Sequence, residues 1–101
     1  MAIHRINHYE AREGRSEELQ AVLLAILGEV RGAPGFLDCR LLQSHEEPWR
    51  FVVLEEWESE DLHGRAAGRV SADLIDAIVP LLRGRPSGGY FSERAGSGLN
   101  G

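Results

Sequence analysis

The chain has 101 residues, 43% of them hydrophobic and 27% charged, which is enough for one packed core and too little for a second domain. Its 16 acidic residues outnumber its 11 basic ones, and the net charge of -5 argues against nucleic acid as a partner, because such a surface needs a clustered basic patch. The first residues lack the apolar segment of a secretion signal, and no apolar run is long enough to span a bilayer, so we expect a cytoplasmic protein with no membrane partner.

The first third of the chain predicts a strand and then a helix. Residues 2–10 alternate between two sets of side chains, as is typical of a strand. These sets are Ile3, Arg5, Asn7 and Tyr9 on one face, and His4, Ile6 and His8 on the other. Ser16 is a candidate N-cap for a helix whose apolar residues recur at helical spacing from Leu19 to Val30. The glycines and proline of residues 31–35 end this helix.

The middle of the chain predicts an antiparallel hairpin. Residues 36–43 and 49–57 are the strands, and the polar residues 44–48 form a link of hairpin length. The second of these strands is apolar on both faces: Trp49, Phe51, Val53 and Trp57 point one way, and Val52 and Leu54 the other.

The last part predicts two short helices and a final strand. Ser59 and Ser71 are candidate N-caps, and Pro80 predicts a kink or a restart within the second helix. Residues 88–94 alternate well enough for a strand, and residues 95–101 are predicted to be a flexible tail, so the domain spans residues 1–94.

This order of elements predicts an α+β fold, a ferredoxin-like βαββαβ sandwich with an antiparallel sheet and helices on one face. The helices supply apolar side chains for one face of the sheet only, so we expect a second copy of the chain to cover the other face in a homodimer. Each subunit would then keep a space between sheet and helices for a small ligand.

The four histidines and the single cysteine are candidate metal ligands or nucleophiles. His4 and His8 share a strand face and would need His45 or His63 to complete a metal site, but no cysteine or acidic set at metal-ligand spacing accompanies them, so we predict no metal. Cys39 lies within a predicted strand and is interpreted as a small buried hydrophobic residue.

Two segments resemble antibiotic biosynthesis monooxygenase (ABM) domains, which are dimeric α+β barrels. Residues 33–37, Ala-Pro-Gly-Phe-Leu, and the following 41–44 are similar to the turn and second strand of that family. Residues 50–59, a hydrophobic strand that ends in glutamate, tryptophan and serine, are similar to its hairpin return.

The resemblance implies oxidation of a small aromatic phenol, quinol or anthrone by dioxygen, with no metal, flavin or other cofactor. Such chemistry needs a pocket for a planar ring, a base and polar donors. His63 is the implied proton acceptor, although the family's histidine on this helix usually comes about one turn later, at Arg65 or Ala66 here. Asn7 is the implied donor to a substrate oxygen, and Trp57 the implied stacking partner.

Tyr9, Arg40 and Phe51 are predicted to contact the substrate. Three of the candidate residues also have a purely structural interpretation: Asn7 as a polar strand residue, Trp57 as core or interface, and Arg40 as the ion-pair partner of Asp38 or Glu55. Two other functions stay open, a non-catalytic dimeric module that binds a small aromatic, and an oxygen-independent isomerase- or cyclase-like protein of a biosynthetic pathway.

Overall fold

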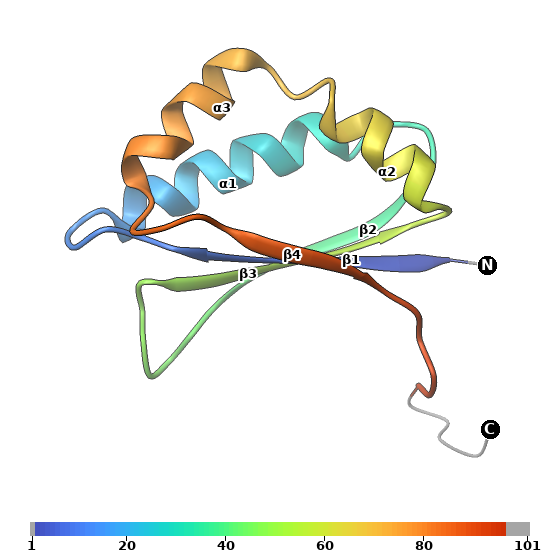
Figure 1. Cartoon of the computed structure of the whole chain (residues 1–101), viewed down its shortest axis with the longest axis horizontal. Helices are drawn as coiled ribbons and strands as arrows, with labels where there is room; N and C mark the ends of the chain where they lie inside the picture. The colour runs from blue at the N-terminus through green and yellow to red at the C-terminus, as the bar shows by residue number, and fades with distance from the viewer. Residues whose placement is uncertain (1, 97–101) are drawn as a thin grey trace.

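The chain forms one four-stranded antiparallel sheet with helices on one of its faces (Figure 1). The computed structural model describes residues 2–96. In chain order the elements are β1 (Ile3–Glu10), α1 (Ser16–Val30), β2 (Phe36–Gln43), β3 (Arg50–Trp57), α2 (Glu60–Ala67), α3 (Ala72–Ile78), the 3-10 turn η1 (Val79–Leu81) and β4 (Ser87–Phe91). The strand order is β2-β3-β1-β4, so the predicted ferredoxin-like βαββαβ fold is confirmed.

The register of the central strands decides which side chains face the helices. β1 and β3 pair antiparallel with Arg5 opposite Glu55 and Asn7 opposite Val53, so these side chains share the helix-covered face. β4 pairs with β1 so that Tyr90 lies opposite Arg5. The predicted alternation of β1 is therefore confirmed, and it brings polar and charged groups under the helices.

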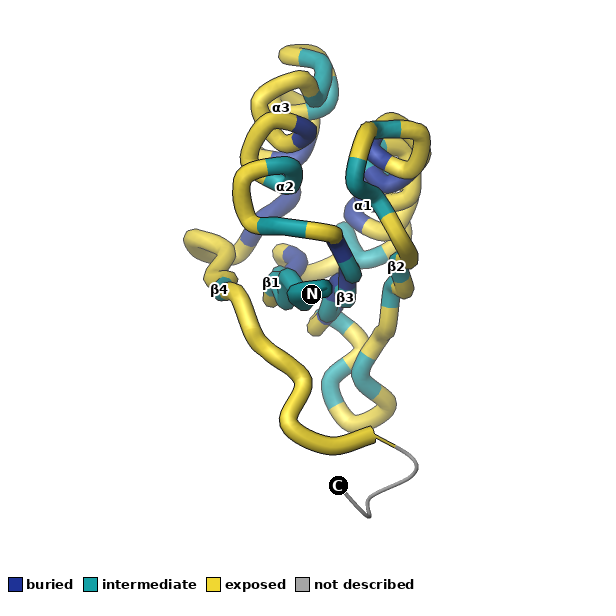
Figure 2. The backbone as a smooth tube through the Cα atoms, turned by 90° about the vertical axis from the view of Figure 1, so that its right-hand side faces the viewer, coloured by how far each residue is buried: buried dark blue, intermediate teal, exposed yellow. Residues whose placement is uncertain are grey.

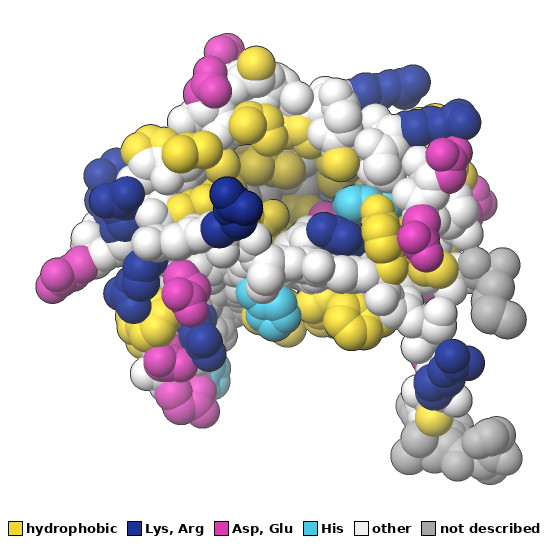
Figure 3. Space-filling view, in the orientation of Figure 1, with side chains coloured by type: hydrophobic (Ala, Val, Ile, Leu, Met, Phe, Trp, Pro, Cys, Tyr) yellow, Lys and Arg dark blue, Asp and Glu magenta, His cyan; other side chains and the backbone are white. Residues whose placement is uncertain are grey.

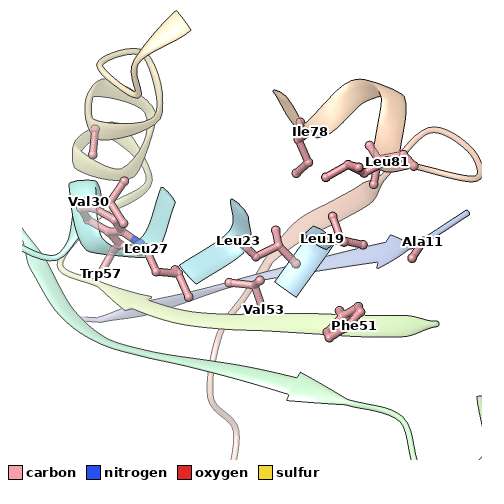
Figure 4. Packing of buried hydrophobic residues seen from close by; sticks show 12 residues of the cluster. Ala11, Leu19, Leu23, Leu27, Val30, Phe51, Val53, Trp57, Ile78 and Leu81 are labelled. Atoms are coloured by element: carbon pink, nitrogen blue, oxygen red, sulfur yellow. The ribbon is translucent and has the colours of Figure 1, made fainter. Parts of the chain in front are cut away.

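The core lies between α1 and β3. Along α1 the buried residues recur every four positions at Leu19, Leu23 and Leu27, and they pack over Phe51 and Val53 of β3 (Figure 4). Burying each of these side chains fully contributes about 1.5–3 kcal/mol. In Figure 2, which colours the backbone by burial, the buried residues gather where the helices meet the sheet.

The helix ends agree with the sequence at Ser59 and differ at Ser16 and Ser71. The Ser59 hydroxyl accepts a hydrogen bond from the Leu62 N–H at 3.2 Å, which is the predicted cap. The predicted Ser16 cap is wrong, because α1 begins with Ser16 itself and the preceding residue, Arg15, occupies the N-cap position without a side-chain cap. Ser71 stands at the N-cap of α3, but its hydroxyl makes no capping bond; instead its backbone N–H donates to Glu29 Oε1 at 2.8 Å.

The predicted break at Pro80 and the predicted turn before β2 are both confirmed. Helix α3 ends at Ile78 and continues as the 3-10 turn η1, which contains Pro80. Gly35 has a φ of 87°, and a Cβ there would meet the Leu62 side chain, so this turn requires glycine for both its conformation and its contact with α2.

The other face of the sheet carries no helix in the described part of the chain (Figure 1). Val52 and Leu54 of β3 are half-buried there, and Leu42 and Phe91 of the flanking strands are 47% and 52% exposed. β3 is therefore apolar on both faces, as expected. The last strand ends at Phe91, earlier than predicted, and of the predicted tail only residues 95 and 96 fall within the described part, where they are exposed.

Candidate functional site

A cavity of about 240 Å³ lies between the helix layer and the sheet. Most of its walls are apolar, and four lining side chains can form hydrogen bonds, three from the sheet and His63 from α2. Figure 3 shows this hollow, with hydrophobic side chains in its depth. The lining residues are Asn7, Tyr9, Ile26, Val30, Glu55, His63, Ala67, Val70, Ile75, Ile78, Leu82 and Pro86. An apolar space with a few convergent polar groups is typical of a small-molecule site.

His63 projects from α2 into the polar end of this cavity. Its Nδ1 lies 2.7 Å from the Tyr90 hydroxyl oxygen, and its Nε2 lies 3.7 Å from Glu55 Oε1. The ring is packed edge-to-face against Trp57 and Tyr90, with centroid distances of 5.5 and 5.4 Å. Contacts from two strands, β3 and β4, thus hold the imidazole of α2 in one orientation.

Glu55 is a buried carboxyl group on the helix-covered face of β3. It is 8% exposed, and its Oε1 accepts a hydrogen bond from the Trp57 indole N–H at 2.8 Å. Burial raises the pKa of Glu55 above its ordinary value, while the Trp57 hydrogen bond and the charge of Arg5 act in the opposite direction. The same carboxylate, after burial, helps to raise the pKa of Tyr9.

The pKa of His63 moves the other way. Burial lowers the pKa of His63, and the charge of Arg5 lowers it further, so the imidazole is neutral near neutral pH. The 3.7 Å separation from Glu55 falls within the distance of an ion pair, but burial disfavours the charged form of both partners. We therefore describe the two groups as a neutral imidazole beside a carboxyl group.

Arg5 organises the other polar groups of the site. Its Nε–H donates to Asn7 Oδ1 at 3.0 Å, and its guanidinium lies 4.7 Å from the centre of the Tyr90 ring. Because the amide oxygen of Asn7 is occupied in this way, the amide Nδ2 is the part of Asn7 that can donate to a ligand in the cavity.

Gly88 on β4 permits this arrangement, and its replacement tests it. A Cβ at residue 88 would clash with Asn7 Oδ1 and would lie 2.8 Å from an Arg5 nitrogen. We expect Gly88→Ala to lower the free energy of unfolding by about 1–3 kcal/mol in urea denaturation, the usual cost of overpacking. Gly89→Ala is the matched control, since its Cβ would make ordinary contacts of 3.5 Å or more with Phe91. Equal stability of the two variants would contradict this account of the Arg5–Asn7 pair.

The structure brings some of the predicted site residues together and separates others. Asn7, Tyr9 and His63 line the cavity. Trp57 is fully buried behind His63 and does not line it. Arg40 lies on the uncovered face, opposite Leu54, with its Nε 3.8 Å from Asp38 Oδ2. Cys39, which was predicted to be buried, is only half-buried.

Phe51 belongs to a different hollow. It is 1% exposed and borders, with Tyr9, a space of about 690 Å³ at the hairpin end of the sheet. That space is lined by the end of β1, the β2–β3 hairpin, and Gly84, Arg85 and Ser87. Three ionisable groups with shifted pKa values, Tyr9, Glu55 and His63, line the 240 Å³ cavity together, whereas only Tyr9 of the three borders the hollow beside Phe51.

Three residues of the site were missed by sequence reasoning: Arg5, Glu55 and Tyr90. Glu55 had a readable signal, because it occupies a core-facing position in β3 between Val53 and Trp57, where a carboxylate is unusual. Arg5 had a weaker one, since it shares a strand face with Asn7. The contact of Tyr90 with His63 joins residues 27 positions apart and has no local signal.

Within residues 2–96 no three His, Cys, Asp or Glu side chains are grouped as a metal ion would require.

One family model matches most of the chain, and solved structures share its fold. The family model for Antibiotic biosynthesis monooxygenase matches residues 2–67. SnoaB from Streptomyces nogalater, a cofactor-independent oxygenase, is 20% identical with a TM-score of 0.84 over 95% of this chain and 96% of its own. A Caulobacter crescentus protein named for the same family is 23% identical with a TM-score of 0.82, covering 93% of this chain and 91% of that one. No curated protein matches the sequence.

None of the described helices is long and apolar enough to cross a membrane.

Proposed function

The chain belongs to the antibiotic biosynthesis monooxygenase family, and from that premise we propose that it oxidises a small aromatic molecule with dioxygen and without a bound cofactor. The observation that supports this proposal is the cavity between sheet and helices, which combines apolar walls with Asn7, Glu55 and His63 at one end. A planar phenol, quinol or anthrone fits such a cavity, since its apolar rings can contact the apolar walls and its oxygen can contact the polar groups.

In the proposed reaction the protein removes a proton and stabilises the anion that results. The phenolic or benzylic proton passes to the His63–Glu55 pair, and its bonding electrons stay on the substrate as an oxyanion. The Asn7 amide donates to that anion. Dioxygen then accepts the substrate's electrons: one oxygen atom becomes a carbonyl oxygen of the product, and the other leaves as water with the two hydrogens that the substrate loses.

Oxygen consumption tests this function. We expect uptake with anthrone or a reduced naphthoquinol above the autoxidation rate, with label from ¹⁸O₂ in the product. His63→Ala should lower the rate about 10²–10⁴-fold if the pair acts in proton transfer. His45→Ala is the matched control, because His45 is exposed in the hairpin. No uptake with any aromatic of the panel would refute the proposed oxygenase, and turnover under anaerobic conditions would indicate an isomerase or cyclase instead.

A non-catalytic module that binds a small aromatic is the second candidate. The observation that favours it is that both ring nitrogens of His63 already face protein groups, Tyr90 and Glu55. This candidate predicts that 1-naphthol raises the melting temperature of the protein, with a shift that keeps growing as its concentration rises above the dissociation constant, and that the reduced naphthoquinols cause no oxygen uptake.

The proposed working unit is a homodimer. The uncovered face of the sheet presents Ile6, Leu42, Val52, Leu54 and Phe91, and a second copy of the same face would remove them from water. Self-association of this kind leaves the cavity on the helix side of each subunit unobstructed. A cytoplasmic location stays a prediction from the sequence.

A further inference from the structure

Four neighbouring side chains run from β3 through α2 to β4, two of them lining the polar end of the cavity and two lying behind it. The Trp57 N–H donates to Glu55 Oε1 at 2.8 Å, Glu55 Oε1 lies 3.7 Å from His63 Nε2, and His63 Nδ1 lies 2.7 Å from the Tyr90 hydroxyl. The two neighbours of the imidazole differ in chemistry. A carboxylate can only accept a hydrogen bond, whereas a tyrosine hydroxyl can also donate one.

This difference selects one tautomer of the neutral imidazole. A hydrogen on Nε2 is attracted by the Glu55 carboxylate, while a lone pair on Nε2 would face that charge. With the hydrogen on Nε2, Nδ1 is the acceptor and the Tyr90 hydroxyl donates to it. The lone pair of the imidazole is then occupied by Tyr90, so it is not free to take a proton from a substrate.

The Glu55 carboxylate, unlike the His63 imidazole, keeps an oxygen that is free to take a proton. Its Oε1 receives the Trp57 bond, and in residues 2–96 no hydrogen bond reaches its Oε2. Arg5 lies directly opposite in the sheet, yet its side chain turns to Asn7 and Tyr90, and no arginine nitrogen of the described chain comes within 4.0 Å of the carboxylate. A buried carboxylate without a cationic partner is a stronger base than an exposed one.

The surroundings of Glu55 include few other ionisable groups. β1 contributes Arg5 and Tyr9, β2 contributes Cys39 directly opposite, and α2 contributes His63. The part of the cavity wall formed by α1 and α3 is apolar and consists of Ile26, Val30, Ile75 and Ile78.

We infer that the Glu55 carboxylate, and not the His63 imidazole, accepts the substrate's proton, and that Tyr90 positions His63 with its Nε2–H as a donor. The inference rests on the proposed function. In the step itself the substrate O–H or C–H bond breaks, a new O–H bond forms on Glu55, and the electron pair remains on the substrate. His63 Nε2–H and the Asn7 amide then donate to the developing oxyanion.

The tautomer is measured without any substrate. In the full-length protein labelled with ¹⁵N-histidine, long-range ¹H–¹⁵N correlations distinguish a protonated nitrogen from an unprotonated one, and His63→Gln identifies the signal. We expect a protonated Nε2 and an unprotonated Nδ1 at pH 7.5, and loss of this preference in Tyr90→Phe. A wild-type protein with the hydrogen on Nδ1 overturns the inference.

The proton acceptor is identified from the pH dependence of kcat/KM for the aromatic with the fastest oxygen uptake. Glu55→Gln should lower kcat/KM about 10²–10⁴-fold and remove the decline at acidic pH. His63→Gln keeps an N–H donor and should retain that decline with a smaller loss. A decline that persists in Glu55→Gln and disappears in His63→Gln overturns the assignment.

The two measurements separate this inference from the proposed function. A chain that oxidises none of the aromatics but has the Nε2–H tautomer contradicts the oxygenase alone and still supports the role of Tyr90. A chain that is active and has the Nδ1–H tautomer supports the oxygenase and overturns the inference.

Discussion

Replacement of Trp57 by alanine should lower the free energy of unfolding by about 3–5 kcal/mol, the usual cost of truncating a large buried aromatic. Trp57 is fully buried at the end of β3, and the Phe36 ring packs edge-on against it at a centroid distance of 5.4 Å. The change also removes the donor to Glu55 Oε1, which leaves a buried carboxyl group without its hydrogen bond. Urea denaturation followed by circular dichroism, at one fixed protein concentration, measures the loss.

Trp57→Phe is a milder second variant. It is needed because a loss of 5 kcal/mol can unfold a small domain outright, and the stability of Trp57→Ala could then not be measured. Phenylalanine retains part of the packing and removes the N–H, so its cost combines the lost Glu55 hydrogen bond with a smaller cavity than alanine leaves. We expect it to be clearly smaller than that of alanine. A loss below about 1 kcal/mol for Trp57→Ala would mean that Trp57 is not a core residue, and its predicted role as a stacking partner for the substrate would regain support.

The sequence predicted the fold because its local signals agreed with one another. Alternation in β1 and β3, helical spacing in α1 and the glycine–proline turn before β2 are patterns within about ten residues, and each specifies one element. The misjudged details were the helix caps at Ser16 and Ser71. A cap depends on one or two backbone angles and on the rotamer of one side chain: Ser71 stands at the N-cap position of α3, yet its hydroxyl makes no capping bond.

The site was less predictable than the fold. Asn7 and Tyr9 were placed correctly on one face because strand alternation decides the face. Arg40 was grouped with them although its strand position assigns it to the opposite face, a conclusion that requires the register of β2 against β3. Tyr90 reaches His63 only because β4 returns beside β1, and no pattern within β4 indicates that contact.

A charge in the middle of the uncovered sheet face should separate the proposed dimer. Leu54 lies on that face opposite Ile6 of β1 and Arg40 of β2, at the centre of the four-stranded sheet. In a face-to-face dimer, Leu54→Asp would bury one unpaired carboxylate from each subunit. An unpaired buried charge costs about 3–5 kcal/mol, which corresponds to a dissociation constant raised at least ~100-fold.

Sedimentation equilibrium at micromolar concentration measures this effect. We expect the wild type at twice the chain mass of 11.2 kDa and Leu54→Asp near that single-chain mass. Leu24→Asp is the matched control, because Leu24 is 51% exposed on the outer surface of α1 and should leave the dimer intact. If wild type and Leu54→Asp both sediment as dimers, association uses another surface. If the wild type is a well-folded monomer, a single layer of helices is sufficient for this sheet, and the apolar residues of its other face have a different purpose.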